Sequence, residues 1–108
     1  MAFKLPDLNY GYSDLEPFID AKTMEIHHSK HHAGYTNNLN NAIKGGNFEE
    51  MDIIDLLKSM DMNNAALRNN GGGFYNHSLF WSIIGPNKGG PAIGDLSDEI
   101  NKCFGSFD

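Results

Sequence analysis

The chain of 108 residues has the length of a single domain, and its composition is close to that of an average globular protein. Its net charge of -6, with 8 basic against 14 acidic residues, argues against nucleic-acid binding, which depends on clustered basic side chains. The single cysteine, Cys103, excludes a disulfide within the chain. No apolar run reaches the roughly 18 residues of a membrane span, and residues 1–8 lack the apolar core of a signal peptide. We therefore expect neither nucleic acid nor membrane as a partner.

The first part of the chain predicts an extended arm followed by a long helix. Residues 1–16 contain proline, glycine and several aromatic residues, which favour an extended arm with turns. Pro17 favours a helix start, because proline suits the first turn and the preceding glutamate interacts well with a helix N-terminus. Residues 20–44 contain no proline and only one glycine, and a pair of glycines follows them. We expect this helix to end at the glycine pair.

A second helix is predicted directly after the glycine pair. Asn47 is a suitable N-cap residue, and acidic residues follow it in the first turn. The apolar residues of this segment recur at helical spacing: Ile53, Ile54, Leu56, Leu57 and Met60. Residues 63–69 extend the helical pattern.

Three consecutive glycines, residues 71–73, then interrupt the pattern. Inside a helix they cost about 3 kcal/mol relative to alanine, so the local sequence predicts a break there. Residues 74–84 form a strongly apolar and aromatic segment, and residues 87–94 form a loop rich in glycine. Ser97, followed by two acidic residues, predicts the start of a further short helix.

The histidines indicate the chemistry of the chain. Four of the five lie in one His-His-Ser-Lys-His-His motif, and the fifth is His77. His27 and His31 are four residues apart and share one helix face, which Tyr35 continues one turn later. Trp81 follows His77 at the same spacing, so two antiparallel helices would turn these two faces toward each other. Because imidazole binds manganese, iron, zinc and copper, this arrangement predicts a metal site between the helices.

Two other interpretations of the histidines stay open on the local pattern. His27 and His31 together chelate one ion in a zinc-hydrolase arrangement, although His28 stands where those enzymes carry a glutamate. Alternatively, the histidines are solvated residues on a helix surface. The simplest interpretation of the remaining candidates is core packing or a solvated charge: Tyr35, Phe80, Trp81, Lys30 and Arg68.

Three motifs together resemble the iron/manganese superoxide dismutase family. Residues 5–17 (LPDLNYGYSDLEP) are similar to its amino-terminal arm. Residues 23–35 (TMEIHHSKHHAGY) resemble its first ligand helix, and residues 69–81 (NNGGGFYNHSLFW) resemble its second. The resemblance continues in order to about Phe107.

The fold implied by this resemblance is all-α for the chain as it stands. Residues 1–89 would form a long antiparallel helical hairpin, and residues 90–108 the linker and first helix of an α/β carboxy-terminal domain. The resemblance also overrules the break at residues 71–73, because the second ligand helix of the family continues through them. The carboxy-terminal domain would supply an aspartate and a third histidine to the metal.

The site residues are implied position by position. His27 and His77 would be two of the four protein ligands of the metal. His31 and Tyr35 would line the substrate funnel and relay protons. Two aromatic residues would wall the site: Phe80 and Trp81.

The implied activity is superoxide dismutation, which converts two superoxide ions and two protons into oxygen and hydrogen peroxide at a redox-cycling manganese or iron. One ion would be bound per complete subunit. Iron-type members commonly carry a glutamine four residues before the second ligand histidine. That position is Gly73 here, so the resemblance leans to manganese. Lys30 and Arg68 are the candidates for steering the superoxide anion.

The complete protein would be a homo-oligomer, either a dimer or a tetramer. Its expected location is the cytoplasm, or the mitochondrial matrix for a mature eukaryotic form. The alternative function is that of a non-catalytic, metal-binding or structural helical fragment, because two histidines alone make a weak site for manganese.

Overall fold

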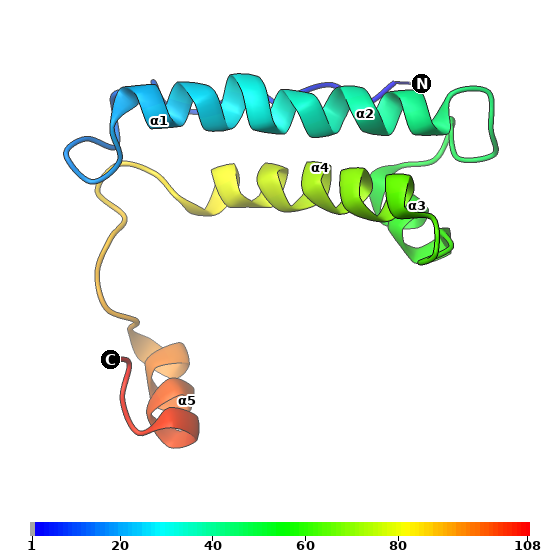
Figure 1. Cartoon of the computed structure of the whole chain (residues 1–108). Helices are drawn as coiled ribbons and strands as arrows, with labels where there is room; N and C mark the ends of the chain where they lie inside the picture. Colours follow the sequence, from blue (N-terminus) through cyan, green and yellow to red (C-terminus); the bar gives the residue numbers. More distant parts are fainter. Residues whose placement is uncertain (1) are drawn as a thin grey trace.

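The structure, a computed structural model, describes residues 2–108, and within that range it contains helices and no strand. The helical elements are α1 (Ala21–Ile26), the π-helical segment η1 (His27–His32), α2 (Ala33–Ile43), α3 (Ile53–Ser59), α4 (Ala65–Ile83) and α5 (Gly94–Phe104). The first three follow one another without interruption, and α4 runs antiparallel beneath them (Figure 1). The all-α fold and the long helical hairpin are therefore confirmed.

The first long helix begins later than Pro17, where the sequence predicted its start. Pro17 lies in a turn, and the helix begins at Ala21 after the N-cap residue Asp20. The Asp20 carboxylate accepts a hydrogen bond from the backbone N–H of Thr23 at 3.3 Å. Hydrogen bonds from the Thr23 side chain and backbone hold the pKa of Asp20 below its usual value. A carboxylate that satisfies a free N–H at a helix start explains the choice of Asp20 over the proline.

The end of this helix agrees with the prediction, and the start of the next helix does not. Gly45 has a φ of +74°, a conformation that glycine adopts without steric cost, and α2 ends just before it at Ile43. Asn47 lies in a turn rather than at an N-cap. Helix α3 begins instead after Asp52, whose carboxylate accepts from the Asp55 N–H at 2.9 Å.

Helix α4 continues through the three glycines, as the family resemblance implied and the local pattern did not. The close approach of neighbouring side chains explains why glycine is present. A Cβ on Gly71 would lie 3.3 Å from Leu57 Cδ2, and a Cβ on Gly73 would lie 2.3 Å from Tyr35 Cδ1. Packing between elements therefore offsets the intrinsic helix cost of these residues.

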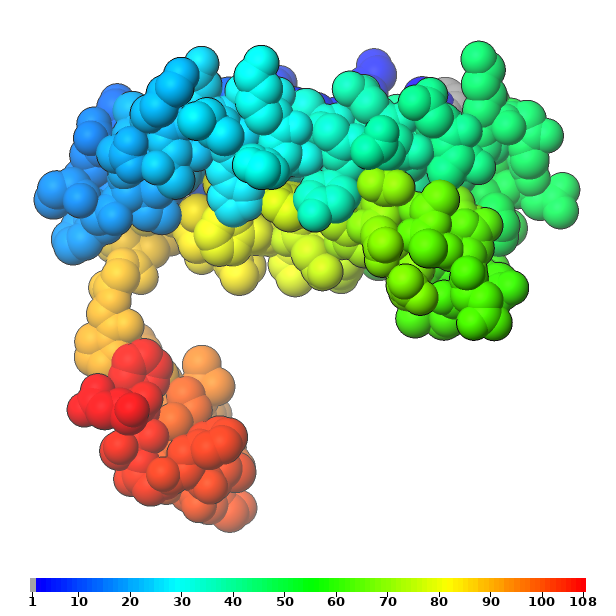
Figure 2. Space-filling view, in the orientation of Figure 1, coloured from blue at the N-terminus to red at the C-terminus, as the bar shows by residue number. Residues whose placement is uncertain are grey.

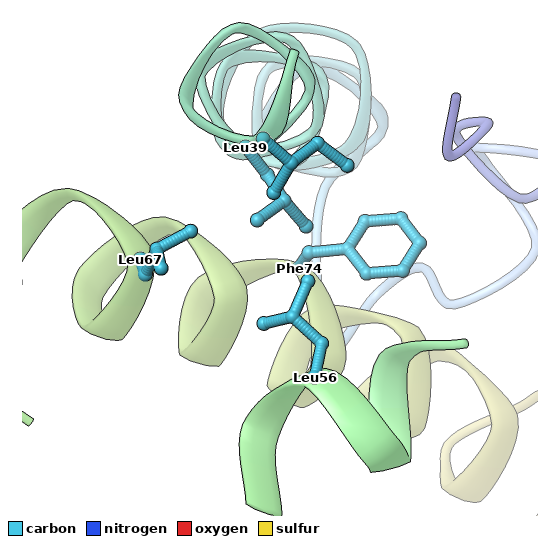
Figure 3. Close-up of a cluster of buried hydrophobic side chains, with 5 residues drawn as sticks. Leu39, Leu56, Leu67 and Phe74 are labelled. Carbon is cyan, nitrogen blue, oxygen red and sulfur yellow. The ribbon is translucent and has the colours of Figure 1, made fainter. Parts of the chain in front are cut away.

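Aliphatic packing joins the two long helices and α3 near the α2–α3 end of the hairpin. We call this group the apolar cluster, and Figure 3 shows its side chains meeting between the helices. Its buried members are Leu39, Ile43, Leu56, Leu67 and Phe74. Leu39 and Leu56 are fully buried. This cluster fixes the spacing of the hairpin on one side of the histidines.

The amino-terminal arm lies along the hairpin and is tied to it at both ends (Figure 1). The Phe3 backbone N–H donates to Asn40 Oδ1 at 2.8 Å, and Asn40 Nδ2 donates to the Phe3 carbonyl at 2.9 Å. Further along, the Tyr10 hydroxyl donates to the Trp81 carbonyl at 2.8 Å. Burial raises the pKa of Tyr10. The arm therefore covers the face of the hairpin behind the histidines.

Helix α5 stands apart from the hairpin (Figure 2) and begins at Gly94, so the predicted cap at Ser97 is wrong. Ile93 occupies the N-cap position without a side-chain hydrogen bond. No residue of α5 is buried, and its apolar residues Leu96 and Phe104 are exposed. None of the helices in residues 2–108 has the length and apolar character needed to cross a membrane.

Candidate metal centre

The first histidine motif forms the π-helical segment η1, which lies within the long first helix. Single π-helical turns inside α-helices occur frequently at functional sites. The six residues of η1 are the motif itself, His27–His32. Despite the change in helical pitch, His27, His31 and Tyr35 all line one hollow, so the predicted shared face is present.

His27 and His77 meet across the hairpin. Their ring centroids are 4.9 Å apart and their planes are nearly perpendicular, at 89°. His77 Nδ1 lies 2.8 Å from the Gly73 carbonyl oxygen. A carbonyl can only accept, so Nδ1 carries the proton and Nε2 is left with its lone pair for a ligand. No hydrogen bond within residues 2–108 occupies the ring nitrogens of His27.

The environment of His27 favours its neutral form. Burial lowers the pKa of His27 below its usual value, and the positive forms of His77 and His31 lower it further. Neutral imidazole is the form that binds a metal ion. Because each ring has a nitrogen without a hydrogen-bond partner, the two histidines are suited to be two of the ligands of one metal ion.

Two aromatic side chains from α4 pack behind this pair. The Phe80 ring lies 5.6 Å from the His27 ring, and the Trp81 ring lies 4.8 Å from it, edge to face. Trp81 is buried and Phe80 is partly buried. Both predicted wall residues therefore contact His27 and exclude water from one side of it.

The open side of the histidine pair is a hollow of about 370 Å³. It is lined by Thr23, Ile26, His27, His31, Tyr35 and His77. The Tyr35 ring lies 5.1 Å from the His77 ring, and the His31 ring lies 6.2 Å from the His27 ring. Sequence reasoning missed Thr23 and Ile26 as lining residues, although Thr23 lies about one turn before His27 and Ile26 directly precedes it.

Neither predicted steering residue lines the hollow. Lys30 is exposed and adjacent to His31 in the sequence. Arg68 is also exposed, but its Nη1 donates to the Met62 carbonyl at 2.9 Å, near the start of α4. The structure therefore brings together six of the eight candidate residues and leaves these two outside.

The sequence also gave no role to His28 and His32, which are both buried. Together with Trp81 they form a second buried group, which we call the histidine cluster. His28 Nε2 lies 2.7 Å from the Pro6 carbonyl oxygen, and His28 Nδ1 lies 2.9 Å from the Tyr12 hydroxyl. His28 therefore ties the arm to the helix. The available sequence signal was the spacing of four residues between His28 and His32, which places them on a second shared helix face.

His32 lies deeper than any other histidine. Trp81 Nε1 donates to His32 Nδ1 at 2.9 Å, and Ser78 Oγ lies 3.4 Å from His32 Nε2. Burial, and then the positive forms of His77 and His28, lower the pKa of His32 to about 4. His32 is therefore neutral at physiological pH, with both ring nitrogens turned to protein groups.

His27 and His77 are the two candidate metal ligands that the described residues bring together at the hollow. Residues 2–108 contain no group of three or more histidine, cysteine or carboxylate side chains placed to hold one ion. His27 and His77 nevertheless fit a metal site, because each has an unpaired nitrogen and the His77 tautomer is fixed by the Gly73 carbonyl. Two imidazoles leave positions open for further ligands.

Comparison with known proteins places this arrangement in one family. A sequence profile described as "Iron/manganese superoxide dismutases, alpha-hairpin domain" matches residues 2–85. The chain is 50% identical over 112 residues to the iron superoxide dismutase of Raoultella planticola, across 100% of this chain and 66% of that protein. It is 48% identical over 111 residues to the Mn/Fe superoxide dismutase of Methylomonas sp. (strain J), across 99% of this chain and 55% of that protein.

A third relative, the iron superoxide dismutase of Synechocystis sp., is 46% identical over 110 residues, across 100% of this chain and 55% of that protein. The chain thus spans between about half and two thirds of the length of these curated relatives. Because the profile covers well over half of the chain, and the matched region holds both helices that meet at His27 and His77, the chain belongs to the iron/manganese superoxide dismutase family and contains its α-hairpin domain.

Proposed function

We propose that this chain is the helical part of a manganese- or iron-dependent superoxide dismutase, and that His27 and His77 are two of the four protein ligands of its metal. One observation carries the proposal. Two imidazoles from separate helices, each with an unpaired nitrogen, lie 4.9 Å apart at the edge of one hollow. The relatives are named as iron or Mn/Fe superoxide dismutases, which supports the same activity here.

The residues around the ligand pair have separate tasks. The bound ion would supply one-electron redox chemistry, by which superoxide becomes oxygen or hydrogen peroxide. The Gly73 carbonyl holds the proton on His77 Nδ1 and orients the ring. Phe80 and Trp81 keep water from the buried side of His27. On the open side, the His31 imidazole and the Tyr35 hydroxyl are the groups that hold and pass protons to an anion in the hollow.

The metal is one manganese or iron ion per complete subunit. The relatives include proteins named for iron alone and proteins named for both metals, so both stay within the proposal. Gly73 favours manganese by the family pattern. The contact with Tyr35 explains why no glutamine is accommodated there, because even a Cβ at position 73 would overlap the Tyr35 ring.

Superoxide is an anion, and the net charge of this chain is -6. Local positive charge is therefore needed near the hollow. Lys30 is the better supported steering residue, because its neighbour His31 lines the hollow. Arg68 is less suited, since its guanidinium is engaged by Met62 and Asn69.

The proposal extends to features of the complete protein. The hairpin domain would end at residue 89, and residues 90–108 would belong to the linker and a carboxy-terminal domain that adds the remaining ligands. The isolated position of α5 supports this boundary. A homo-oligomer, either a dimer or a tetramer, and a cytoplasmic or mitochondrial location stay predictions.

Titration with Mn²⁺ tests the ligand assignment. We would measure free Mn²⁺ by electron paramagnetic resonance in solutions of the chain and three variants. His27→Ala and His77→Ala each remove a ligand and should weaken binding at least about tenfold. His31→Ala is the matched control, because it changes a histidine of the same hollow that the proposal does not use as a ligand. It should change the dissociation constant less than about threefold.

The outcomes separate the alternatives. Equal losses in His27→Ala and His31→Ala, with no loss in His77→Ala, would support a zinc-hydrolase chelate and overturn the proposal. The proposal assigns the remaining ligands to the carboxy-terminal domain, so a superoxide-consumption assay addresses catalysis only in a protein that contains that domain. Mn²⁺ binding through His27 and His77 without turnover in such a protein would favour the non-catalytic helical fragment, the second candidate.

A further inference from the structure

We propose that His32 is a positioning residue that holds the Trp81 indole against His27. The inference rests on the proposed function, because it assigns His32 a task at the same metal site. His32 itself lines no part of the hollow and would touch neither substrate nor metal. It acts through a side chain that packs behind a ligand.

The contact between His32 and Trp81 is buried on both sides. His32 is 0% exposed and Trp81 is 5% exposed. Trp81 Nε1 and His32 Nδ1 are 2.9 Å apart. An indole N–H in such a place needs an acceptor, because leaving it unpaired costs the desolvation of the group. His32 supplies that acceptor from the opposite helix.

Hydrogen-bond directions fix the protonation of His32. The indole nitrogen can only donate, so His32 Nδ1 must be unprotonated and His32 Nε2 carries the proton. Nε2–H then points to Ser78 Oγ at 3.4 Å, and the Ser78 hydroxyl donates to the Phe74 carbonyl at 2.8 Å. Three hydrogen bonds therefore run in one direction and end at the α4 backbone.

This chain of hydrogen bonds sets the position of the rings around the ligand pair. The Trp81 indole stands edge to face against His27, with ring centroids 4.8 Å apart. The His32 ring also packs against the His77 ring at 5.4 Å. If the indole lost its acceptor, it would be free to take another rotamer, and His27 would lose the wall that limits its own rotation.

Histidine suits this position because it accepts at one ring nitrogen and donates at the other. Asparagine can reproduce the acceptor, since its Oδ1 occupies nearly the same place as Nδ1. Leucine fills a similar volume without any polar atom. The pair His32→Leu and His32→Asn therefore separates loss of the acceptor from loss of the ring.

The first test uses the unmodified chain with ¹⁵N-labelled histidine. Two-bond ¹H–¹⁵N correlation spectra distinguish the two neutral tautomers of each imidazole. We expect His32 to carry its proton on Nε2, and we expect the Trp81 indole N–H to exchange slowly with solvent. A proton on Nδ1 of His32 would overturn the proposal, because the indole could then not donate to it.

The second test compares the two variants, using Trp81 as the only tryptophan in the chain. His32→Leu should speed exchange of the indole N–H by at least about tenfold and remove the nuclear Overhauser contacts between Trp81 and His27. His32→Asn should keep those contacts and hold exchange within about threefold of the unmodified chain. Contacts that persist in His32→Leu, or that vanish equally in both variants, would overturn the positioning role.

These readouts need no metal, so they stand apart from the proposed function. If Mn²⁺ fails to bind the unmodified chain while the spectra behave as expected, the ligand assignment fails and the placement of Trp81 by His32 stands. If Mn²⁺ binds, His32→Leu should weaken binding about threefold or more and His32→Asn should restore it. Loss of folding in His32→Leu would leave the tautomer and the His32→Asn contacts as the decisive measurements.

Discussion

The apolar cluster and the histidine cluster both join the two long helices, but they do so with different chemistry. The apolar cluster, around Leu39 and Leu56, depends on burial of aliphatic surface, which has no directional requirement. The histidine cluster, around His28 and His32, depends on hydrogen bonds whose donors and acceptors must match. The first cluster brings the helices together, and the second determines how the side chains near the candidate metal centre are turned.

This difference explains why the site lies beside the histidine cluster. A metal ligand needs a fixed orientation, and directional hydrogen bonds provide one where aliphatic packing does not. The same directionality makes the histidine cluster sensitive to pH, because a proton on an accepting nitrogen breaks the match. We therefore expect truncation of a side chain to lower stability most in the apolar cluster, and acid to lower stability through the histidine cluster.

The largest effect is expected from Leu39→Ala in the apolar cluster. Leu39 is 0% exposed, so its truncation removes buried aliphatic surface and leaves a cavity. The free energy of unfolding should fall by about 3–5 kcal/mol, as measured by urea denaturation at neutral pH. Leu79→Ala on α4 is the control, because Leu79 is 46% exposed, and it should cost less than about 1 kcal/mol. Similar losses in the two variants would contradict the assignment of the core.

Acid should act on the histidine cluster. The pKa of His32 is lowered to about 4, so as pH falls below the usual imidazole value the unfolded chain takes up a proton that the folded chain does not. The free energy of unfolding of the metal-free chain should therefore decrease between about pH 6.5 and pH 4, with a contribution of about 3 kcal/mol from His32. The neighbouring charges that oppose protonation are those of His77, His28 and His27.

Urea denaturation at several pH values measures this slope. His32→Asn has no titrating group at this position and should show a shallower pH dependence, while Leu39→Ala should lower stability equally at every pH. An unchanged slope in His32→Asn would mean that another group carries the acid sensitivity.

Alanine substitutions at Gly73 and Gly72 distinguish the effect of steric fit on stability from the effect of helix propensity. Alanine favours a helix over glycine by about 1 kcal/mol, but a Cβ at position 73 would lie 2.3 Å from Tyr35 Cδ1. Gly73→Ala should therefore destabilise the chain by about 1–3 kcal/mol and displace Tyr35 from the hollow. Gly72→Ala is the matched control, because a Cβ there meets nothing within 4 Å, and it should stabilise by about 0.5–1 kcal/mol. Thermal unfolding of both variants measures the two effects, and equal signs would refute the packing argument.

The sequence predicted those features that depend on spacing along one element. His27, His31 and Tyr35 were expected on one face, and all three line the hollow. His77 and Trp81 were expected opposite them, and both pack against His27. Such spacing holds because a helix repeats its faces regularly, even across the π-helical segment.

Other features depended on which of several candidate residues caps a helix, or on contacts between helices. The local pattern did not predict these features. Asp20 and Asp52 cap helices for which Pro17 and Asn47 were expected to provide the start, because several residues in each stretch could serve and only one meets a free N–H. The helix through Gly73 was implied by family resemblance and contradicted by local propensity.

The role of His32 could not be read from the sequence for a related reason. Its partners Trp81 and Ser78 lie on the other long helix, and the register between the two helices decides which pairs meet. That register is set by the apolar cluster, whose members come from α2, α3 and α4. Aliphatic packing at one end thus determines the hydrogen bonds available at the other.

The smallest expected effect tests how the arm depends on the histidine cluster. His28 Nε2–H donates to the Pro6 carbonyl, so His28 Nδ1 accepts from the Tyr12 hydroxyl at 2.9 Å. Tyr12→Phe removes that donor and should lower the free energy of unfolding by about 1 kcal/mol.

Tyr75→Phe is the control, since no hydrogen bond within residues 2–108 involves the Tyr75 hydroxyl, and it should have almost no effect. Faster amide exchange in the arm of Tyr12→Phe, with α2 unchanged, would locate the loss at His28, whereas equal exchange in both variants would mean that Asn40 and Tyr10 hold the arm without it.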